Sequence, residues 1–211
     1  MDDDLFPASD FDAWAPTYDA DVAVGSGFPF DGYQKVLQAV LRKAEVSSGM
    51  RVLDLGAGTG NLTALFAQAG CQVWGTDYSA EMVALARRKF PNIPFIQADI
   101  RAPWTTALSQ SFDRIVSAYA FHHFDQAEKV AIINRLARSH LVPGGRIVIA
   151  DIAFVDQHSM DAAAESLGSE WEVEFYWVAS EDLPALAEAG LQARFKQISP
   201  YAGVFTIQPG F

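Results

Sequence analysis

Residues 52–61 read VLDLGAGTGN, an apolar run that leads directly into three glycines at alternate positions. The next residues, within NLTALFAQAG (61–70), have the apolar spacing typical of a helix. Because glycine has no Cβ, a glycine-rich backbone can turn sharply and lets another molecule approach closely. The stretch therefore predicts a strand, a tight turn and a helix, with a ligand held against the turn.

Strand-like and helix-like patterns alternate along the chain around this turn. The strand-like runs are 51–55, 72–76, 94–97, 113–118 and 146–151, and the helix-like runs are 31–45, 61–69, 80–90 and 126–139. Ser79 is placed to cap the helix over 80–90, and Pro91 ends it. Pro143-Gly144-Gly145 predicts a turn into the fifth strand.

The strands are continuous apolar runs, which favours burial on both faces, as in a parallel sheet covered by helices. We therefore predict an α/β, Rossmann-like, doubly wound and mostly parallel seven-stranded sheet. At the end of the chain, 180–190 reads as a helix, and two strand-like runs around Ser199-Pro200-Tyr201-Ala202 predict an antiparallel hairpin. We expect one domain over 1–211, with these parts: an N-terminal arm (1–30), a cofactor-binding core (31–154), a variable lid segment (155–180) and a C-terminal helix and hairpin (181–211).

The charge and hydropathy of the chain argue against nucleic-acid and membrane partners. The 211 residues carry a formal net charge of −11, and the 15 lysines and arginines never form a run longer than Arg87-Arg88-Lys89. A nucleic-acid-binding protein needs a basic surface to displace counterions, so we expect no nucleic-acid partner. No apolar window is long enough to span a membrane, the N-terminus is acidic, and Cys71 is the single cysteine. We expect a cytoplasmic protein without membrane contact.

The glycine turn differs from the common nucleotide-binding motifs. In a dinucleotide-binding GxGxxG motif beginning at Gly56, position 61 would be glycine, but it is Asn61, and the third glycine is Gly60. No Gly-Lys-Ser/Thr follows, which argues against a phosphate-binding P-loop. Asp77 lies about 20 residues beyond the first glycine, the usual offset of a carboxylate that binds ribose hydroxyls. The pattern indicates a ligand with a ribose but without a pyrophosphate.

Several motifs together carry a family resemblance. VLDLGAGTG, an acid ending the second strand, ADI (98–100) and PGGRIVIAD (143–151) resemble class I S-adenosylmethionine (SAM)-dependent methyltransferases over residues 33–155. FDAWAPTYD (11–19), SAYAFHH (117–123) and ADIAFVDQ (150–157) resemble the YrrT-type uncharacterised bacterial methyltransferases in particular. The resemblance implies SAM as the cofactor.

The resemblance and the side-chain chemistry together assign a cofactor site. Asp77 would bind the ribose hydroxyls, Asp99 the adenine amino group, and Ser117 would lie near the methionine moiety. Asp54 either orients the turn or reaches the cofactor ammonium through water, and Tyr18 would close over the cofactor. Plainer roles stay open: helix capping, a surface turn, loop hydrogen bonds or core packing. The full predicted set is Tyr18, Asp54, Gly56, Ala57, Gly58, Asp77, Tyr78, Met82, Asp99, Ile100 and Ser117.

Tyr119, His122 and His123 are the candidate catalytic side chains. Methyl transfer is an in-line displacement that needs a base only if the acceptor must lose a proton, and histidine titrates near neutral pH. The two histidines are equally compatible with a structural pair that shapes the loop. Asp125 and His158 lie nearby in sequence, but no recognised metal-ligand spacing is present, and we expect no metal.

The function predicted is methyl transfer from SAM to a small-molecule acceptor, releasing S-adenosylhomocysteine (SAH). Two alternatives remain, a non-catalytic SAM sensor and an aminopropyl transferase, while Asn61 argues against an NAD-dependent dehydrogenase. Segments 1–30 and 155–180 are expected to select the acceptor. The aromatic stretch WEVEFYW (171–177) within the latter fits a lid, a core or a homodimer contact.

Overall fold

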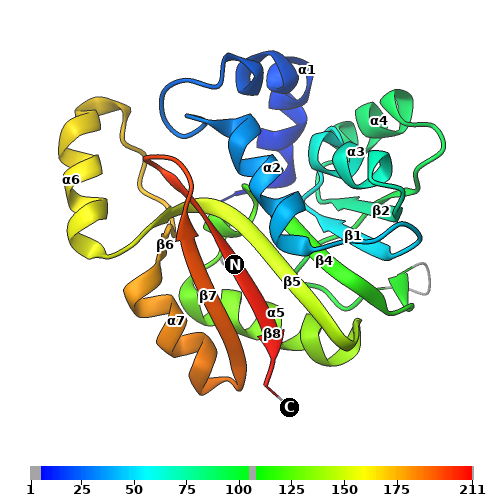
Figure 1. Ribbon diagram of the computed structural model, residues 1–211. Helices are drawn as coiled ribbons and strands as arrows, with labels where there is room; N and C mark the ends of the chain where they lie inside the picture. The colour runs from blue at the N-terminus through cyan, green and yellow to red at the C-terminus, as the bar shows by residue number, and fades with distance from the viewer. Residues whose placement is uncertain (1–5, 105–107, 211) are drawn as a thin grey trace.

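A computed structural model describes residues 6–104 and 108–210 and shows one sheet with helices on both faces (Figure 1). The strand order is β3-β2-β1-β4-β5-β8-β7, and β6 pairs with the end of β5. Strands β1 to β5 pair in parallel, whereas β8 pairs antiparallel with both β5 and β7. The strands are β1 (Arg51–Leu55), β2 (Gln72–Asp77), β3 (Phe95–Gln97), β4 (Phe112–Ala118), β5 (Leu141–Phe154), β6 (Trp177–Val178), β7 (Leu191–Gln197) and β8 (Ala202–Pro209).

This architecture confirms the predicted doubly wound, mostly parallel sheet with its C-terminal hairpin. The main path has the seven expected strands, and the two-residue strand β6 is an eighth that the sequence did not indicate. The helices are α1 (Ala8–Val24), α2 (Tyr33–Ala44), α3 (Asn61–Gln68), α4 (Ala80–Lys89), α5 (Gln126–Ser139), α6 (Gln157–Leu167) and α7 (Ala179–Glu188), with short 3-10 helices η2 (Phe121–His123) and η3 (Gly168–Glu170).

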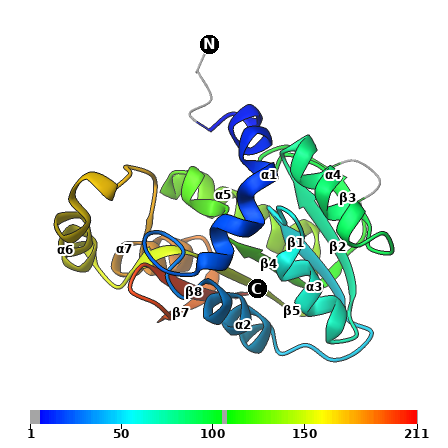
Figure 2. The same ribbon diagram turned by 90° about the horizontal axis from the view of Figure 1, so that it is seen from above.

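Alternate residues of the central strands point into two separate cores. Leu53 belongs to a core with residues of α5 and α7, whereas its neighbour Val52 belongs to a core with residues of α2 and α3. The same alternation separates Ile115 from Val116. Figure 2 shows α2 and α3 on the side of the sheet opposite α5. Burial on both faces explains why these strands read as continuous apolar runs.

The predicted turn at Pro143-Gly144-Gly145 is wrong, because these residues lie within β5. Leu141 already pairs with Phe112, and Arg146 pairs with Arg114, so the residues between them form an irregularity inside the strand pair. Gly144 has φ +75°, a conformation that glycine adopts without strain. The strand therefore begins before the glycines, which bend the chain within it.

The N-terminal arm contains α1, which carries two carboxylates that contact the helices beside the sheet edge. Asp12 accepts hydrogen bonds from Ser79 Oγ at 2.5 Å and from the Glu81 N–H at 3.1 Å, at the start of α4. Asp19 accepts one from Thr59 Oγ1 at 2.5 Å and lies 2.7 Å from Lys89 Nζ. These contacts hold α1 over the carboxyl ends of the parallel strands (Figure 2). Residues 1–5 of the expected arm lie outside the described residues.

Helix α6 and the segment leading to β6 occupy most of the region expected to be variable (Figure 1). Within the described parts of the chain, no helix has the length and apolar character needed to cross a membrane.

Candidate active site

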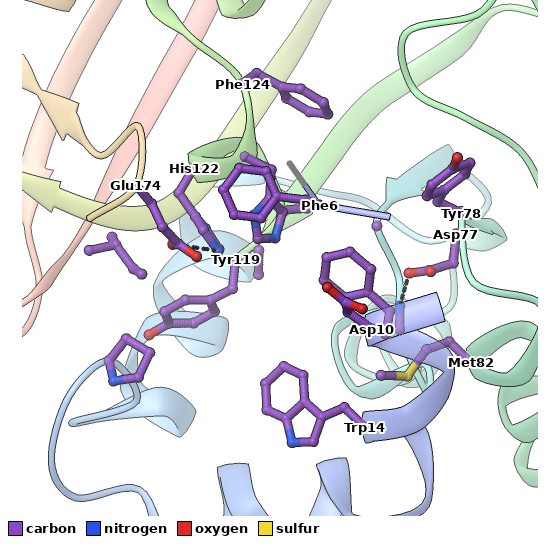
Figure 3. A pocket seen from close by; sticks show the side chains of 18 of the residues that line it. Phe6, Asp10, Trp14, Asp77, Tyr78, Met82, Tyr119, His122, Phe124 and Glu174 are labelled. Atoms are coloured by element: carbon purple, nitrogen blue, oxygen red, sulfur yellow. Dashed lines mark hydrogen bonds and ion pairs between the residues drawn. The ribbon is translucent and has the colours of Figure 1, made fainter. Parts of the chain in front are cut away.

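A cavity of about 470 Å³ lies at the carboxyl ends of the parallel strands, beneath α1 (Figure 3). Sheets of this type bind ligands at that edge, where loops from neighbouring strands meet. Most of the predicted site residues line it, namely Tyr18, Gly56, Gly58, Asp77, Tyr78, Met82, Asp99, Ile100, Tyr119, His122 and His123. Asp54, Ala57 and Ser117 lie outside the lining.

The glycine turn depends on left-handed backbone at Gly56 and Gly58, and at Gly56 there is also no room for a side chain. Gly56 has φ +61°, and a Cβ there would lie 2.4 Å from the Ala120 side chain. At Gly58, φ is +54°, and its N–H donates a hydrogen bond to Asp77 Oδ2 at 2.8 Å. The turn is thereby tied to the end of β2, with backbone exposed at the cavity wall.

Asp77 is held on both carboxylate oxygens. Oδ2 accepts from Gly58, and Oδ1 accepts from the Ser79 N–H at 2.9 Å. Burial raises the pKa of this carboxyl. A carboxylate offers about four acceptor positions, so two remain for a ligand. Capping of α4 belongs to Ser79, whose Oγ accepts from the Met82 N–H at 3.0 Å.

Three predicted residues stand behind the cavity wall and support the turn. Asp54 is fully buried and accepts from Thr63 Oγ1 at 2.6 Å, while its Oδ1 has no hydrogen-bond partner among the described residues. Burial raises the pKa of Asp54 to about 7. Ser117 Oγ donates to the Leu55 carbonyl at 2.8 Å, and Ala57 packs with Phe95 in a small core.

Asp99 follows β3 and forms an ion pair with Arg101. Asp99 Oδ1 accepts from the Arg101 backbone N–H at 2.8 Å, and the Arg101 guanidinium lies 3.1 Å from Oδ2. The guanidinium also lies 5.7 Å from the centre of the Tyr78 ring. Asp99, Tyr78 and Arg101 therefore form one end of the cavity together with Asp77.

Three tyrosines meet between α1 and the sheet. The Tyr18 hydroxyl lies 3.5 Å from that of Tyr33, and the Tyr33 ring stacks on Tyr119 with centroids 5.6 Å apart. Tyr119 has φ +57°, a region that bulky residues occupy only when their surroundings impose it. Its hydroxyl is buried without a hydrogen-bond partner among the described residues, and burial raises its pKa. Tyr119 thus contributes a ring to the wall, with its oxygen shielded.

His122 lies between two carboxylates. Its Nδ1 is 2.5 Å from Asp151 Oδ1, and its Nε2 is 3.5 Å from Glu174 Oε2 (Figure 3). The other Asp151 oxygen accepts from the N–H groups of Phe121 and His122, at 2.7 and 3.1 Å. Burial alone would lower the pKa of His122, but Asp151 more than offsets it, and the pKa is raised. Because Asp151 binds Nδ1, the neutral ring presents Nε2 as its proton acceptor.

His123 packs against aromatic rings, unlike His122, which pairs with carboxylates. Its ring lies 4.0 Å from that of His122 and packs against Phe6 and Phe11, with centroids 4.5 and 5.1 Å away. One ligand atom each from His122, His123 and Glu174 lie within 4.8 Å of one another. Ligands of a tetrahedral zinc ion are roughly 3.3 Å apart. The three side chains would have to move together to bind such an ion.

Asp125 and His158, the other metal candidates from the sequence, have different positions. Asp125 caps α5 by accepting from the Glu128 N–H at 2.8 Å, and His158 is exposed on α6.

Sequence reasoning assigned no role to Asp151 or Glu174. Asp151 is the single charge in the buried run IVIADIAF, and a charge in such a run signals a paired carboxylate. Glu174 lies within the aromatic stretch WEVEFYW (171–177), where the rings are the stronger sequence signal. The N–H of Phe175 donates to the His122 carbonyl at 3.0 Å, which holds this segment against η2.

Comparisons with known proteins agree with this fold. Residues 52–145 match the family model described as "Methyltransferase domain". An uncharacterised methyltransferase of Anoxybacillus flavithermus is 38% identical over 157 residues, which are 72% of this chain and 70% of the relative. The uncharacterised methyltransferase GK2543 of Geobacillus kaustophilus is 33% identical over 208 residues, covering 92% of this chain and 93% of the relative.

A solved structure described as the DhpI-SAM-HEP complex shares the fold, with a TM-score of 0.75 and 23% identity over 95% of both chains. The chain belongs to the class I SAM-dependent methyltransferases. A second relative that covers most of the chain is the uncharacterised methyltransferase OB1106 of Oceanobacillus iheyensis, 30% identical over 93% of this chain and 94% of the relative.

Proposed function

We propose that the cavity binds SAM at its Asp77 end, binds a small-molecule acceptor at its His122 end, and transfers the methyl group between them. One observation carries this proposal: Asp77, tied to the glycine turn, and His122, tied to Asp151, line the same cavity. Its volume of about 470 Å³ is within the range of small-ligand sites. Donor and acceptor would therefore meet in one enclosed space.

The residues at the first end fit the cofactor. Gly56, where a Cβ would collide with Ala120, leaves backbone available for close approach by the ribose and methionine parts. Asp77 keeps acceptor positions for two ribose hydroxyls, and Asp99, which lines the same end of the cavity, is proposed to accept from the adenine amino group. When bound, SAM would supply a methyl group on its sulfonium sulfur, and attack of the acceptor on the methyl carbon would break the carbon–sulfur bond and release SAH. Trp14 and Tyr18 of α1 line the same space and exclude water from it.

His122 is the group proposed to take the acceptor's proton. Asp151 keeps its ring oriented with Nε2 toward the cavity and stabilises the ring after it accepts the proton. Asp151 is thus a positioning residue, because it acts through His122. Its three backbone hydrogen bonds, from Phe121, His122 and Ile152, keep it in place.

Calorimetric titration with SAM, SAH, decarboxylated SAM and NADH tests the cofactor assignment. We expect SAM and SAH to bind and the other two to bind at least about tenfold more weakly. Preference for decarboxylated SAM would support an aminopropyl transferase, and binding of NADH would contradict the cofactor site. SAM binding without SAH formation in the presence of any acceptor would support a sensor.

A further inference from the structure

We infer that the methyl acceptor is a cationic amine, held as its ammonium form beside Glu174 and between aromatic rings. The inference rests on the proposed function and assigns a substrate class to its acceptor end. It follows from the charges, the rings and the position of the base around this part of the cavity.

The charges at the two ends of the cavity differ. Arg101 is the one lysine or arginine among the described lining residues, and it is paired with Asp99 at the Asp77 end. At the other end the lining includes Glu172 and Glu174, both from the segment that leads to β6. Figure 3 shows Glu174, His122 and Tyr119 on the side away from Asp77, Tyr78 and Met82. An anionic acceptor would meet carboxylates there without a lysine or arginine to pair with.

Glu174 is positioned to meet a cation. The N–H of the next residue, Phe175, donates to the His122 carbonyl at 3.0 Å, and the Phe175 carbonyl accepts from Lys129 Nζ. These bonds fix Glu174 beside His122 Nε2, and burial raises the pKa of its carboxyl. The Glu174 side chain is mostly shielded from water, with 16% of it exposed, and its one facing charge partner among the described residues is His122 at 3.5 Å. A shielded carboxylate is stabilised by a close cation, and an ammonium group would supply one.

Aromatic rings complete this end. Phe28, Phe30 and Tyr119 line the cavity, and the Phe30 and Tyr119 centroids are 5.3 Å apart. Phe28 is supported from behind by Trp171 at 5.5 Å. Ring faces attract alkylammonium groups, and they do so more strongly where the site is shielded from water. A ring wall beside a carboxylate is a site suited to an amine with an apolar body.

The base is placed where an ammonium acceptor needs it. An alkylammonium group has a pKa of about 10 and cannot attack until it loses a proton. Nε2 of His122 takes that proton, which then passes to water. The nitrogen lone pair forms the new bond to the methyl carbon, the carbon–sulfur bond breaks, and its electron pair remains on the sulfur of SAH. The products are a methylated ammonium ion, SAH and one proton.

Matched probes of different charge test the inference. SAH affinity is measured first, and 2-phenylethylamine, 2-phenylethanol and phenylacetate are then titrated into the SAH-saturated protein, with butylamine, butanol and butyrate as a second series. We expect each amine to bind at least about tenfold more tightly than its alcohol and acid. With SAM, N-methylated amine should be detected by mass spectrometry.

Glu174→Gln should remove most of that preference while SAH affinity stays within a few-fold, which also shows that the variant folds. Glu165→Gln on α6, an exposed change outside the cavity lining, is the matched control and should leave both affinities unchanged. If SAH binds but the amines are not preferred, or if no probe binds at all, the amine inference is overturned and the proposed function is not. Absence of SAH binding would overturn the proposed function itself.

Discussion

Asp151, near the end of β5, holds Nδ1 of His122, in the short helix after β4, at 2.5 Å, and both residues are buried. Because the carboxylate sits on one ring nitrogen, the other is directed to Glu174 and the cavity. The pair gives a histidine with a raised pKa and a defined proton-accepting atom. His122 and Asp77 line the same cavity.

The Asp151–His122 pair predicts an acid limb in the pH profile of methyl transfer. The neutral ring is the base, so kcat falls as pH decreases through the pKa of His122, which lies above its ordinary value of 6.5. Asp151→Asn should move this limb to lower pH and reduce kcat by about 10²-fold, because the imidazolium loses its carboxylate. KM should change little. An unshifted limb in a folded variant would show that Asp151 has only a structural role.

His122→Gln should lower kcat by about 10²- to 10⁴-fold, the usual contribution of a general base. SAH affinity should stay within a few-fold, because His122 lies away from the Asp77 end. His123→Gln is the matched change, since His123 packs on Phe6 and Phe11 and should affect kcat less. Loss of SAH binding in the His122 variant would instead place His122 in the cofactor site.

Asp77→Ala should weaken SAM and SAH binding by at least about tenfold, because two ribose hydrogen bonds are lost. The change also leaves the Gly58 and Ser79 N–H groups without this acceptor. Asp77→Asn keeps one acceptor oxygen and should have the smaller effect. Calorimetry measures both variants, and undiminished affinity in folded Asp77→Ala protein would contradict the proposed ribose contact.

Asp54 predicts a pH dependence of stability. Its folded-state pKa of about 7 lies above the ordinary value of 3.8, so the protonated carboxyl contributes to the free energy of unfolding. That contribution is fully present below pH 3.8 and is lost as pH rises through about 7. Asp54→Asn keeps an acceptor for Thr63 without a charge. We expect this variant to lose less stability between pH 5 and 8 than the unaltered protein, by roughly 1–4 kcal/mol. Denaturant unfolding at several pH values measures it, and parallel curves would contradict the prediction.

Asp19 connects α1 to Thr59 and Lys89, so its loss should loosen the arm over the cavity. Asp19→Ala should weaken SAH binding by roughly three- to tenfold, since the anchor is partly exposed and screened by solvent. Proteolysis after α1 should become faster in the same variant. Asp161→Ala on exposed α6 is the control. Equal affinity and equal proteolysis in both variants would show that the arm is held by its apolar contacts.

Much of the fold was predictable because strand burial and turn chemistry are local. The run VLDL, the glycines after it and the acid ending β2 predict one end of the cavity from sequence alone, since residues after parallel strands share one sheet edge. The turn predicted at Pro143-Gly144-Gly145 failed because pairing with β4 extends β5 across those residues. Strand β6 and helix α6 were also missed, because their positions depend on β5 and the aromatic segment.

By itself the sequence determined the doubly wound, mostly parallel α/β sheet with its C-terminal hairpin, the glycine turn and the acidic character of the chain, and it predicted Asp77 as the carboxylate for a ribose. Only the tertiary structure decided that Asp151 and Glu174 flank His122, and that Asp54 and Ser117 stand behind the cavity. The physical reason is that these relationships are contacts between segments far apart in the chain. Local periodicity records which residues are buried, whereas packing decides which buried and polar groups meet.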